Sequence, residues 1–296
     1  MKLDAGFIPA LGTPLDSDGR VIAKSYQEQI ERMIQAGCCA VLSMGSMGQQ
    51  AFIRSEETPK IAKLAVEQVR GRVPVFVGTM DTAIHRAGER MAAMDGIGLD
   101  AFVFTTSYYA PCSRDQVINY YKGVCAQTKK PVFIYDLPGV TQTPISYGEV
   151  VELTKALPNL NGIKSGNLAL HRQLHLHLGG EIPADFKTMY SGLDTFDIAF
   201  KWGIPNYLDG MITCTPHNFD VMDKSMKAGD YDTAARCLTN VVELRDFFIA
   251  RDLWPAYSAA MNMLGFEGDF SPDYVSSISA AKVEEVRGEM KKIGEL

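Results

Sequence analysis

The sequence predicts an α/β protein with a (β/α)8 TIM barrel and a C-terminal helical extension. First, apolar runs of strand length alternate with amphipathic segments of helix length along the chain. Second, these runs are apolar on both faces, which is typical of parallel strands covered by helices. Third, the chain has 296 residues, and such a barrel takes about 250. Eight strands joined by right-handed crossovers then close into a barrel.

The expected strands are the apolar runs, and a helical segment follows each of them. In chain order the strands are 7–11, 39–44, 73–79, 101–105, 131–135, 160–164, 186–190 and 207–212. Helices are expected at 22–36, from after Ser55 to about 70, and at 82–96, 114–128, 146–156 and 169–178. The segment Ser55-Glu56-Glu57-Thr58 has the form of an N-cap with acidic residues in the first turn.

The remaining C-terminal part carries helical patterns at 231–250, 253–264 and 280–292. No Pro/Gly/Ser-rich linker separates this part from the barrel. We therefore expect residues 1–226 to form a catalytic barrel and residues 227–296 to form helices that pack on it.

Composition excludes several classes of function. The net charge is -6 and no basic stripe is present, which argues against a nucleic-acid partner. No apolar stretch is long enough to span a membrane, and the N-terminus lacks the apolar segment of a signal peptide. The six cysteines have no CxxC spacing, so we expect reduced thiols and a cytoplasmic protein. They are Cys38, Cys39, Cys112, Cys125, Cys214 and Cys237.

The strand at 160–164 ends on Lys164, and this lysine is the first candidate for catalysis. The charged form of an amine is disfavoured among the apolar walls at the carboxyl end of a barrel strand. A neutral amine in such a place can attack a carbonyl and form a Schiff base. Because barrels of this kind place catalysis on the loops after the strands, other strand-end residues become candidates as well.

Three hydroxyl groups follow other strands and complete the predicted site. Ser46 follows the second strand, Tyr109 the fourth, and Tyr135 ends the fifth. A tyrosine hydroxyl can shuttle protons for a lysine nucleophile, and a chain from Tyr135 through Ser46 to a second tyrosine would relay them. The turn at 45–48 offers backbone N–H groups to a carboxylate. Gly192 follows the seventh strand and Ile212 closes the eighth.

Several ordered motifs resemble the dihydrodipicolinate synthase / N-acetylneuraminate lyase family of Schiff-base-forming lyases and aldolases. They are the opening segment at 6–16, the turn Gly45-Ser46-Met47-Gly48, the pair Tyr108-Tyr109, the segment Tyr135-Asp136-Leu137-Pro138 and Gly162-Ile163-Lys164. The resemblance covers essentially the whole chain, and several motifs in order are far more specific than any one of them.

The resemblance implies a role for each candidate. Lys164 would form the imine with pyruvate or a longer 2-keto acid, and Tyr135 would transfer protons. Ser46 would bind the keto-acid carboxylate, and Tyr109 would complete the relay from a neighbouring subunit. The Ile212 carbonyl would face the lysine. The resemblance also implies a homotetramer built as a dimer of dimers, and neither a metal nor an organic cofactor.

The chain departs from the family pattern at positions that select the substrate. The turn carries Met47 and Gln49 in place of a hydroxyl and an acid, and Val140 stands where the synthases have an arginine. The loop after the seventh strand keeps only Asp194 of an Asp-Glu pair, and Cys214 replaces a sugar-binding serine. The expected substrate-binding residues are Ser46, Met47, Gln49, Asp136, Val140, Gly192 and Ile212, and Gln49, Asp136, Thr141 and Gln142 would contact the distal part of the substrate.

We expect a lyase that cleaves or forms a 2-keto-3-deoxy acid or a 4-hydroxy-2-keto acid, with pyruvate and an aldehyde or sugar acid as partners. The alternatives are a dehydratase or deaminase of a 2-keto acid, an N-acetylneuraminate lyase, a 4-hydroxy-tetrahydrodipicolinate synthase, and a catalytically silent paralogue that only binds ligand.

The histidines His171, His175 and His177 invite a metal interpretation, but no glutamate completes a zincin pattern. We expect them on a solvated helix face.

Overall fold

The computed structural model describes residues 2–296, and eight parallel strands form its centre. The strands are β1 (Gly6–Pro9), β2 (Val41–Ser43), β3 (Val75–Gly78), β4 (Ala101–Phe104), β5 (Val132–Asp136), β6 (Leu160–Ser165), β7 (Lys187–Tyr190) and β8 (Asn206–Asp209). From β2 to β8 each strand pairs in parallel with the next one in the chain, and β1 pairs in parallel with β8. A parallel bridge between Ala10 and Leu42 joins β1 to β2. The predicted (β/α)8 barrel is therefore confirmed.

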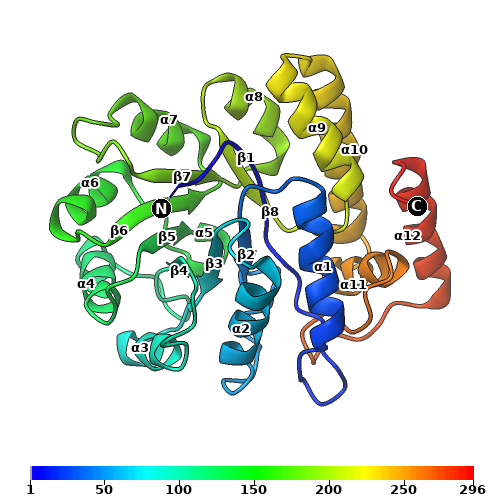
Figure 1. Cartoon of the computed structure of the whole chain (residues 1–296), viewed down its shortest axis with the longest axis horizontal. Coiled ribbons are helices and arrows are strands. Elements are labelled where there is room, and N and C mark those ends of the chain that lie inside the picture. The colour runs from blue at the N-terminus through cyan, green and yellow to red at the C-terminus, as the bar shows by residue number, and fades with distance from the viewer. Residues whose placement is uncertain (1) are drawn as a thin grey trace.

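Helices cover the outside of the barrel (Figure 1). They are α1 (Ala23–Gln35), α2 (Thr58–Val69), α3 (Ile84–Ala92), α4 (Arg114–Cys125), α6 (Tyr147–Ala156), α7 (Leu168–Leu176), α8 (Phe196–Lys201) and α9 (Pro216–Ala228). The short helix α5 (Pro138–Thr141) and the 3-10 helices η1 (Leu193–Thr195) and η2 (Met211–Thr213) follow β5, β7 and β8. No helix of residues 2–296 is long and apolar enough to cross a membrane.

Two apolar clusters lie on the two sides of the strands. The inner cluster fills the barrel with alternate residues of the strands, among them Phe76, Val103, Phe133, Tyr135 and Met189. The residues between them point outward and form the larger cluster with the helices. This alternation follows from the two-residue period of a strand. It decides which strand-end side chains reach the interior of the barrel.

The C-terminal helices α10 (Tyr231–Ile249), α11 (Leu253–Met263) and α12 (Ala280–Lys292) confirm the three helical patterns expected there. Figure 1 shows them together on one side of the barrel, next to α1. The guanidinium of Arg32 on α1 lies 4.5 Å from the ring centre of Phe266 in the loop after α11. The division at residue 226 stays a prediction, and it falls inside α9.

Some element bounds differ from the sequence-based prediction for local reasons. The second helix begins at Thr58 instead of directly after Ser55, because Pro59 occupies its first turn, where a missing N–H costs no hydrogen bond. The eighth strand ends at Asp209 and does not reach Ile212. The Asp209 carboxylate accepts a hydrogen bond from the Met211 amide at 2.8 Å, and the chain turns there into η2.

Candidate active site

Lys164 lies on β6 and extends its amine into the barrel interior. Its register partners are Tyr135 on β5 and Met189 on β7, and both belong to the inner cluster. The lysine is 5% exposed, so its amine is enclosed by the barrel. Its Nζ lies 3.6 Å from the ring centre of Tyr135, so the amine and the phenol ring are in contact.

A glycine two residues before the lysine makes room for the floor of the site. A side chain at Gly162 would collide with the ring of Phe133 and with the Lys187 carbonyl. The Phe133 ring instead packs against Phe76 across the barrel, with ring centres 5.1 Å apart. Gly162 thus lets an aromatic layer fill the barrel directly below Lys164.

Tyr135 connects the lysine with the turn after β2. Its hydroxyl lies 3.1 Å from the Ser46 hydroxyl, and either group can donate this hydrogen bond. The phenol ring faces the amine while the phenol oxygen faces the serine, so one side chain contacts both groups. An amine, a phenol and a serine hydroxyl on β6, β5 and the β2 turn therefore come together as the sequence predicted.

The turn after β2 has an unusual backbone. Met44 and Gln49 have φ angles of 52° and 60°, a left-handed conformation that costs energy for residues other than glycine. Between them, the amides of Ser46, Met47 and Gly48 donate to no acceptor within residues 2–296. Successive amides without an internal partner are the arrangement that binds a carboxylate or another anion.

Tyr109 stands apart from the other three candidates. It lies in the loop after β4 and is 89% exposed. Within residues 2–296, no hydrogen bond joins it to Ser46 or Tyr135. Its insertion into the site of a neighbouring subunit stays a prediction.

The structure corrects the interpretation of Asp136 as a residue that contacts the substrate. Asp136 is the neighbour of the inward-facing Tyr135, so its side chain points outward. Its carboxylate accepts hydrogen bonds from the Ile145 amide at 3.0 Å and from the Ser165 hydroxyl at 2.6 Å. Burial raises the pKa of the Asp136 carboxyl, and the Ser165 hydrogen bond opposes that rise. Asp136 anchors the chain behind the site.

The expected role of Gln49 in contacting the substrate also differs from its position in the structure. Its side chain is buried beneath the turn, and its amide nitrogen donates to the Thr13 carbonyl at 3.4 Å. Its backbone amide donates to the Ser46 carbonyl and closes the turn. Gln49 therefore shapes the turn instead of contacting the distal part of a substrate.

The other expected substrate-binding residues lie at the carboxyl ends of the strands. Met47 packs against Gly210, where a Cβ would meet the Met47 side chain at 2.7 Å. Val140 is on α5 and is 52% exposed. Gly192 precedes η1, and a side chain there would collide with the Tyr190 ring. Ile212 is buried in η2, so its carbonyl leaves a 3-10 turn and not a strand.

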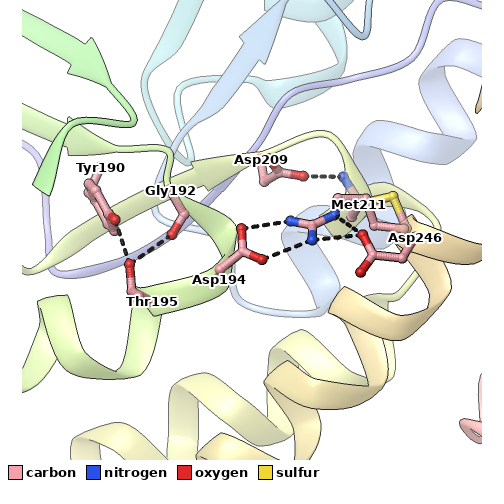
Figure 2. Close-up of polar contacts among 8 residues, drawn as sticks. Tyr190, Gly192, Asp194, Thr195, Asp209, Met211 and Asp246 are labelled. Atoms are coloured by element: carbon pink, nitrogen blue, oxygen red, sulfur yellow. Dashed lines mark hydrogen bonds and ion pairs between the residues drawn. The ribbon is translucent and has the colours of Figure 1, made fainter. Parts of the chain in front are cut away.

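Asp194, on the loop after β7, has a charged partner that the sequence interpretation missed. Figure 2 shows Gly192, Asp194 and Thr195 on the loop after β7, beside Asp209 and Met211 at the end of β8. Arg245 on α10 binds both Asp194 carboxylate oxygens at 2.7 and 2.8 Å. These hydrogen bonds raise the pKa of Arg245 and lower that of Asp194. No local pattern predicts this pair, because its members are 51 residues apart.

Asp209 adds a second carboxyl group to this side of the site. Burial raises the pKa of Asp209, while the Met211 amide and then the Lys164 amine favour its charged form. Within residues 2–296, no group of three or more His, Cys, Asp or Glu side chains is placed to hold a metal ion.

His171 does not lie on a solvated face, contrary to the expectation from the sequence. It is fully buried on α7, and its Nε2 donates to the carbonyl of Ser165, the residue after Lys164, at 3.0 Å. Its ring packs edge-on against Tyr190 with ring centres 5.3 Å apart. His175 is partly buried and bonds the Thr188 hydroxyl at 2.7 Å. These histidines are structural parts of the layer outside β6 and β7.

We expect His171 to make the protein less stable in mild acid. Burial lowers its pKa from 6.5 to about 4. Between these values the unfolded chain binds a proton that the folded chain excludes, so stability is complete above pH 6.5 and falls toward pH 4. The full loss is about 3 kcal/mol. Denaturant unfolding at pH 7 and pH 4 should show a smaller loss for His171→Gln than for the wild type.

The matched control is His85→Gln, which replaces an exposed histidine on α3 and should lose as much stability as the wild type. Equal losses in His171→Gln and the wild type would contradict the assignment.

Comparisons with known proteins identify a family to which the whole chain is similar. The model of the "Dihydrodipicolinate synthetase family" matches residues 4–289. A 4-hydroxy-tetrahydrodipicolinate synthase of Methylococcus capsulatus is 29% identical over 300 residues, which cover 98% of this chain and 99% of the relative. A protein of the same name from Phenylobacterium zucineum is 28% identical over 293 residues, covering 98% and 97%.

Solved structures show the same fold. YagE, a prophage protein of the dihydrodipicolinic acid synthase family from E. coli K12 in complex with pyruvate, superposes with a TM-score of 0.88 at 21% identity, covering 99% of both chains. The chloride-inhibited dihydrodipicolinate synthase of Acinetobacter baumannii, complexed with pyruvate, gives 0.86 at 21% identity and covers 100% of both chains. At this identity the likeness concerns the fold alone.

Proposed function

Because this chain belongs to the dihydrodipicolinate synthetase family of lysine Schiff-base enzymes, we propose that it cleaves or forms a 4-hydroxy-2-keto acid through an imine on Lys164. The products of cleavage are pyruvate and an aldehyde, and 2-keto-3-deoxy sugar acids are the favoured substrates. One observation supports this most strongly. The Lys164 amine is enclosed beside Tyr135, whose hydroxyl lies 3.1 Å from Ser46.

The proposed reaction begins at the amine. Neutral Lys164 adds to the keto carbon, and water leaves to form the imine. The bond between C3 and C4 then breaks, and its electrons move toward the imine nitrogen to form an enamine. Tyr135 takes the proton of the C4 hydroxyl as the aldehyde forms, and Ser46 continues the proton path. Protonation of C3 and hydrolysis of the imine release pyruvate and restore the amine.

The turn after β2 is the proposed carboxylate site. The amides of Ser46, Met47 and Gly48 have no acceptor within residues 2–296, and the Ser46 hydroxyl lies beside them. Together they offer hydrogen bonds to the substrate carboxylate without a positively charged side chain. Pyruvate fits this site as the common fragment of the proposed substrates, and two family members have been solved with it.

A synthase activity is the second candidate, because the relatives of similar length carry the name 4-hydroxy-tetrahydrodipicolinate synthase. Val140 weighs against it, since an apolar side chain on α5 offers no charge to a second carboxylate. A dehydratase or deaminase would use the same imine. A silent binding paralogue is disfavoured, because a binder has no need of an enclosed amine. The tetramer and the cytoplasmic location stay predictions of the sequence.

Two measurements on the purified protein test the proposal. In deuterated water, the enamine should exchange the methyl protons of pyruvate, which NMR detects without any second substrate. With an aldehyde panel, hydroxyaldehydes should consume pyruvate faster than aldehydes that carry a carboxylate. A folded protein that exchanges no methyl protons would overturn the imine mechanism. A preference for the carboxylate-bearing aldehydes would favour the synthase.

A further inference from the structure

Thr105 is a buried hydroxyl residue at the carboxyl end of β4. It is 2% exposed, and its Oγ1 has no hydrogen-bond partner within residues 2–296. Side chains of β4 alternate between the two sides of the barrel wall. Ala101 and Val103 belong to the inner cluster, whereas Phe102 and Phe104 belong to the outer one. Continuing this alternation by one residue places Thr105 on the inner side of the barrel.

The register of the sheet sets Thr105 beside the reaction centre. Phe104 is the last residue of β4 and pairs with Ile134 on β5, so extending the register by one residue places Thr105 next to Tyr135. Tyr135 pairs on its other side with Lys164 on β6. The order across the barrel wall is therefore Lys164, Tyr135 and Thr105, with the proton-transferring phenol between the amine and the threonine.

A buried hydroxyl without a partner destabilises a fold, since it has lost its hydrogen bonds to water and gained none. On the inner side of the barrel, a bound ligand can supply the missing partner, and a threonine hydroxyl can both donate and accept. The turn after β2 already offers hydrogen bonds to a carboxylate, and Lys164 takes the keto carbon. The position left for Thr105 lies farther along the substrate, past Tyr135.

We infer that Thr105 is a specificity-determining residue that hydrogen-bonds the oxygen on C4 of the bound keto acid. This inference rests on the proposed function, because it places C2 at Lys164. The inference assigns to the site substrates with a hydroxyl on C4 and disfavours 2-keto acids that have no hydroxyl there. Tyr135 takes the proton of this hydroxyl, and Thr105 orients it toward Tyr135.

The test compares two probes that differ only in that hydroxyl: 4-hydroxy-2-oxobutanoate and 2-oxobutanoate. Borohydride reduces either imine and fixes the ligand on Lys164. Peptide mass spectrometry counts both the four-carbon adduct and the pyruvyl adduct that remains when the hydroxylated acid is cleaved before reduction. In the wild type, half-maximal trapping should need about fivefold to tenfold less of the hydroxylated acid, as one hydrogen bond to a buried hydroxyl allows. Thr105→Val should remove this preference, and Thr105→Ser should restore most of it.

A matched control is available on β3. Thr79 is also fully buried with an unpartnered hydroxyl, but it lies between the inward-facing positions of Gly78 and Met80 and so points outward. Thr79→Val should keep the preference. Thermal melting confirms that each variant folds, and valine is close in shape to threonine and suits a strand.

The outcomes separate this inference from the proposed function. A wild type that traps neither probe contradicts the imine on Lys164 itself. A wild type that traps both acids equally, or a Thr105→Val variant that keeps the preference, overturns the assignment of Thr105 while leaving the imine intact.

Discussion

Replacing Lys164 by alanine is expected to lower turnover by at least about 10³-fold and to remove the borohydride-dependent pyruvate adduct. The reason is that the proposed covalent intermediate needs the amine, and Lys164 is the one buried lysine among residues 2–296. Lys164→Arg should be as inactive as alanine, because a guanidinium does not lose its proton to become a nucleophile. Borohydride reduction in the presence of pyruvate, followed by peptide mass spectrometry, measures the amount of adduct in both variants.

Lys187→Ala is the matched control for this experiment. Lys187 is partly exposed at the start of β7, across from Gly162, at the opposite end of the strand from the site. The Lys187→Ala variant should form the pyruvate adduct on Lys164 to the same extent as the wild type. An adduct that persists in Lys164→Ala on another lysine would place the nucleophile elsewhere. A fully active Lys164→Ala variant would remove the Schiff base from the mechanism.

Replacing Tyr135 by phenylalanine is expected to lower kcat by about 10²- to 10⁴-fold, the usual contribution of a general acid–base group. The ring that packs against the Lys164 amine stays, and only the hydroxyl that faces Ser46 is lost. The pyruvate adduct should therefore still form in Tyr135→Phe, although more slowly. Steady-state kinetics of pyruvate formation and the rate of trapping separate the two effects.

Tyr26→Phe is the matched control, because Tyr26 forms a similar buried pair. Its hydroxyl lies 2.7 Å from the Ser43 hydroxyl, on the outer side of β2. This variant should lose some stability and keep its turnover. If Tyr135→Phe turned over within about threefold of the wild type, the tyrosine would not be the proton shuttle. If both variants lost turnover equally, the effect would be structural.

Both predictions concern the chemistry of the site, and other residues bear on the choice of substrate. Lys164, Tyr135 and Ser46 carry the proposed imine chemistry, which is common to the family. Val140 and Thr105 bear on which second fragment the site accepts, because one withholds a charge and the other offers a hydroxyl. Arg245 on α10 binds Asp194 on the loop after β7, so a helix outside the barrel fixes the position of this loop. In this proposal the substrate class depends on residues that take no part in the imine chemistry.

Much of the site was predictable because it depends on local sequence. A strand that ends on a lysine, a tyrosine that ends the preceding strand and a serine in a glycine-rich turn each follow from the order of residues. The barrel rule then brings strand ends together without knowledge of any contact. The sequence prediction failed for Asp136 and Gln49, because it treated any polar residue near a strand end as facing the substrate.

The sequence by itself determined the eightfold alternation of strands and helices, the position of Lys164 at a strand end, and the placement of Tyr135 and Ser46 at the same end of the barrel. These depend on periodicity and spacing, which each segment carries on its own. Only the tertiary structure decided that Asp136 faces outward, that His171 is buried, that Ile212 lies in a 3-10 turn, and that Phe104, just before Thr105, pairs with Ile134, just before Tyr135. These depend on register and on where each strand ends. Both are fixed by hydrogen bonds and packing between segments that lie far apart in the chain.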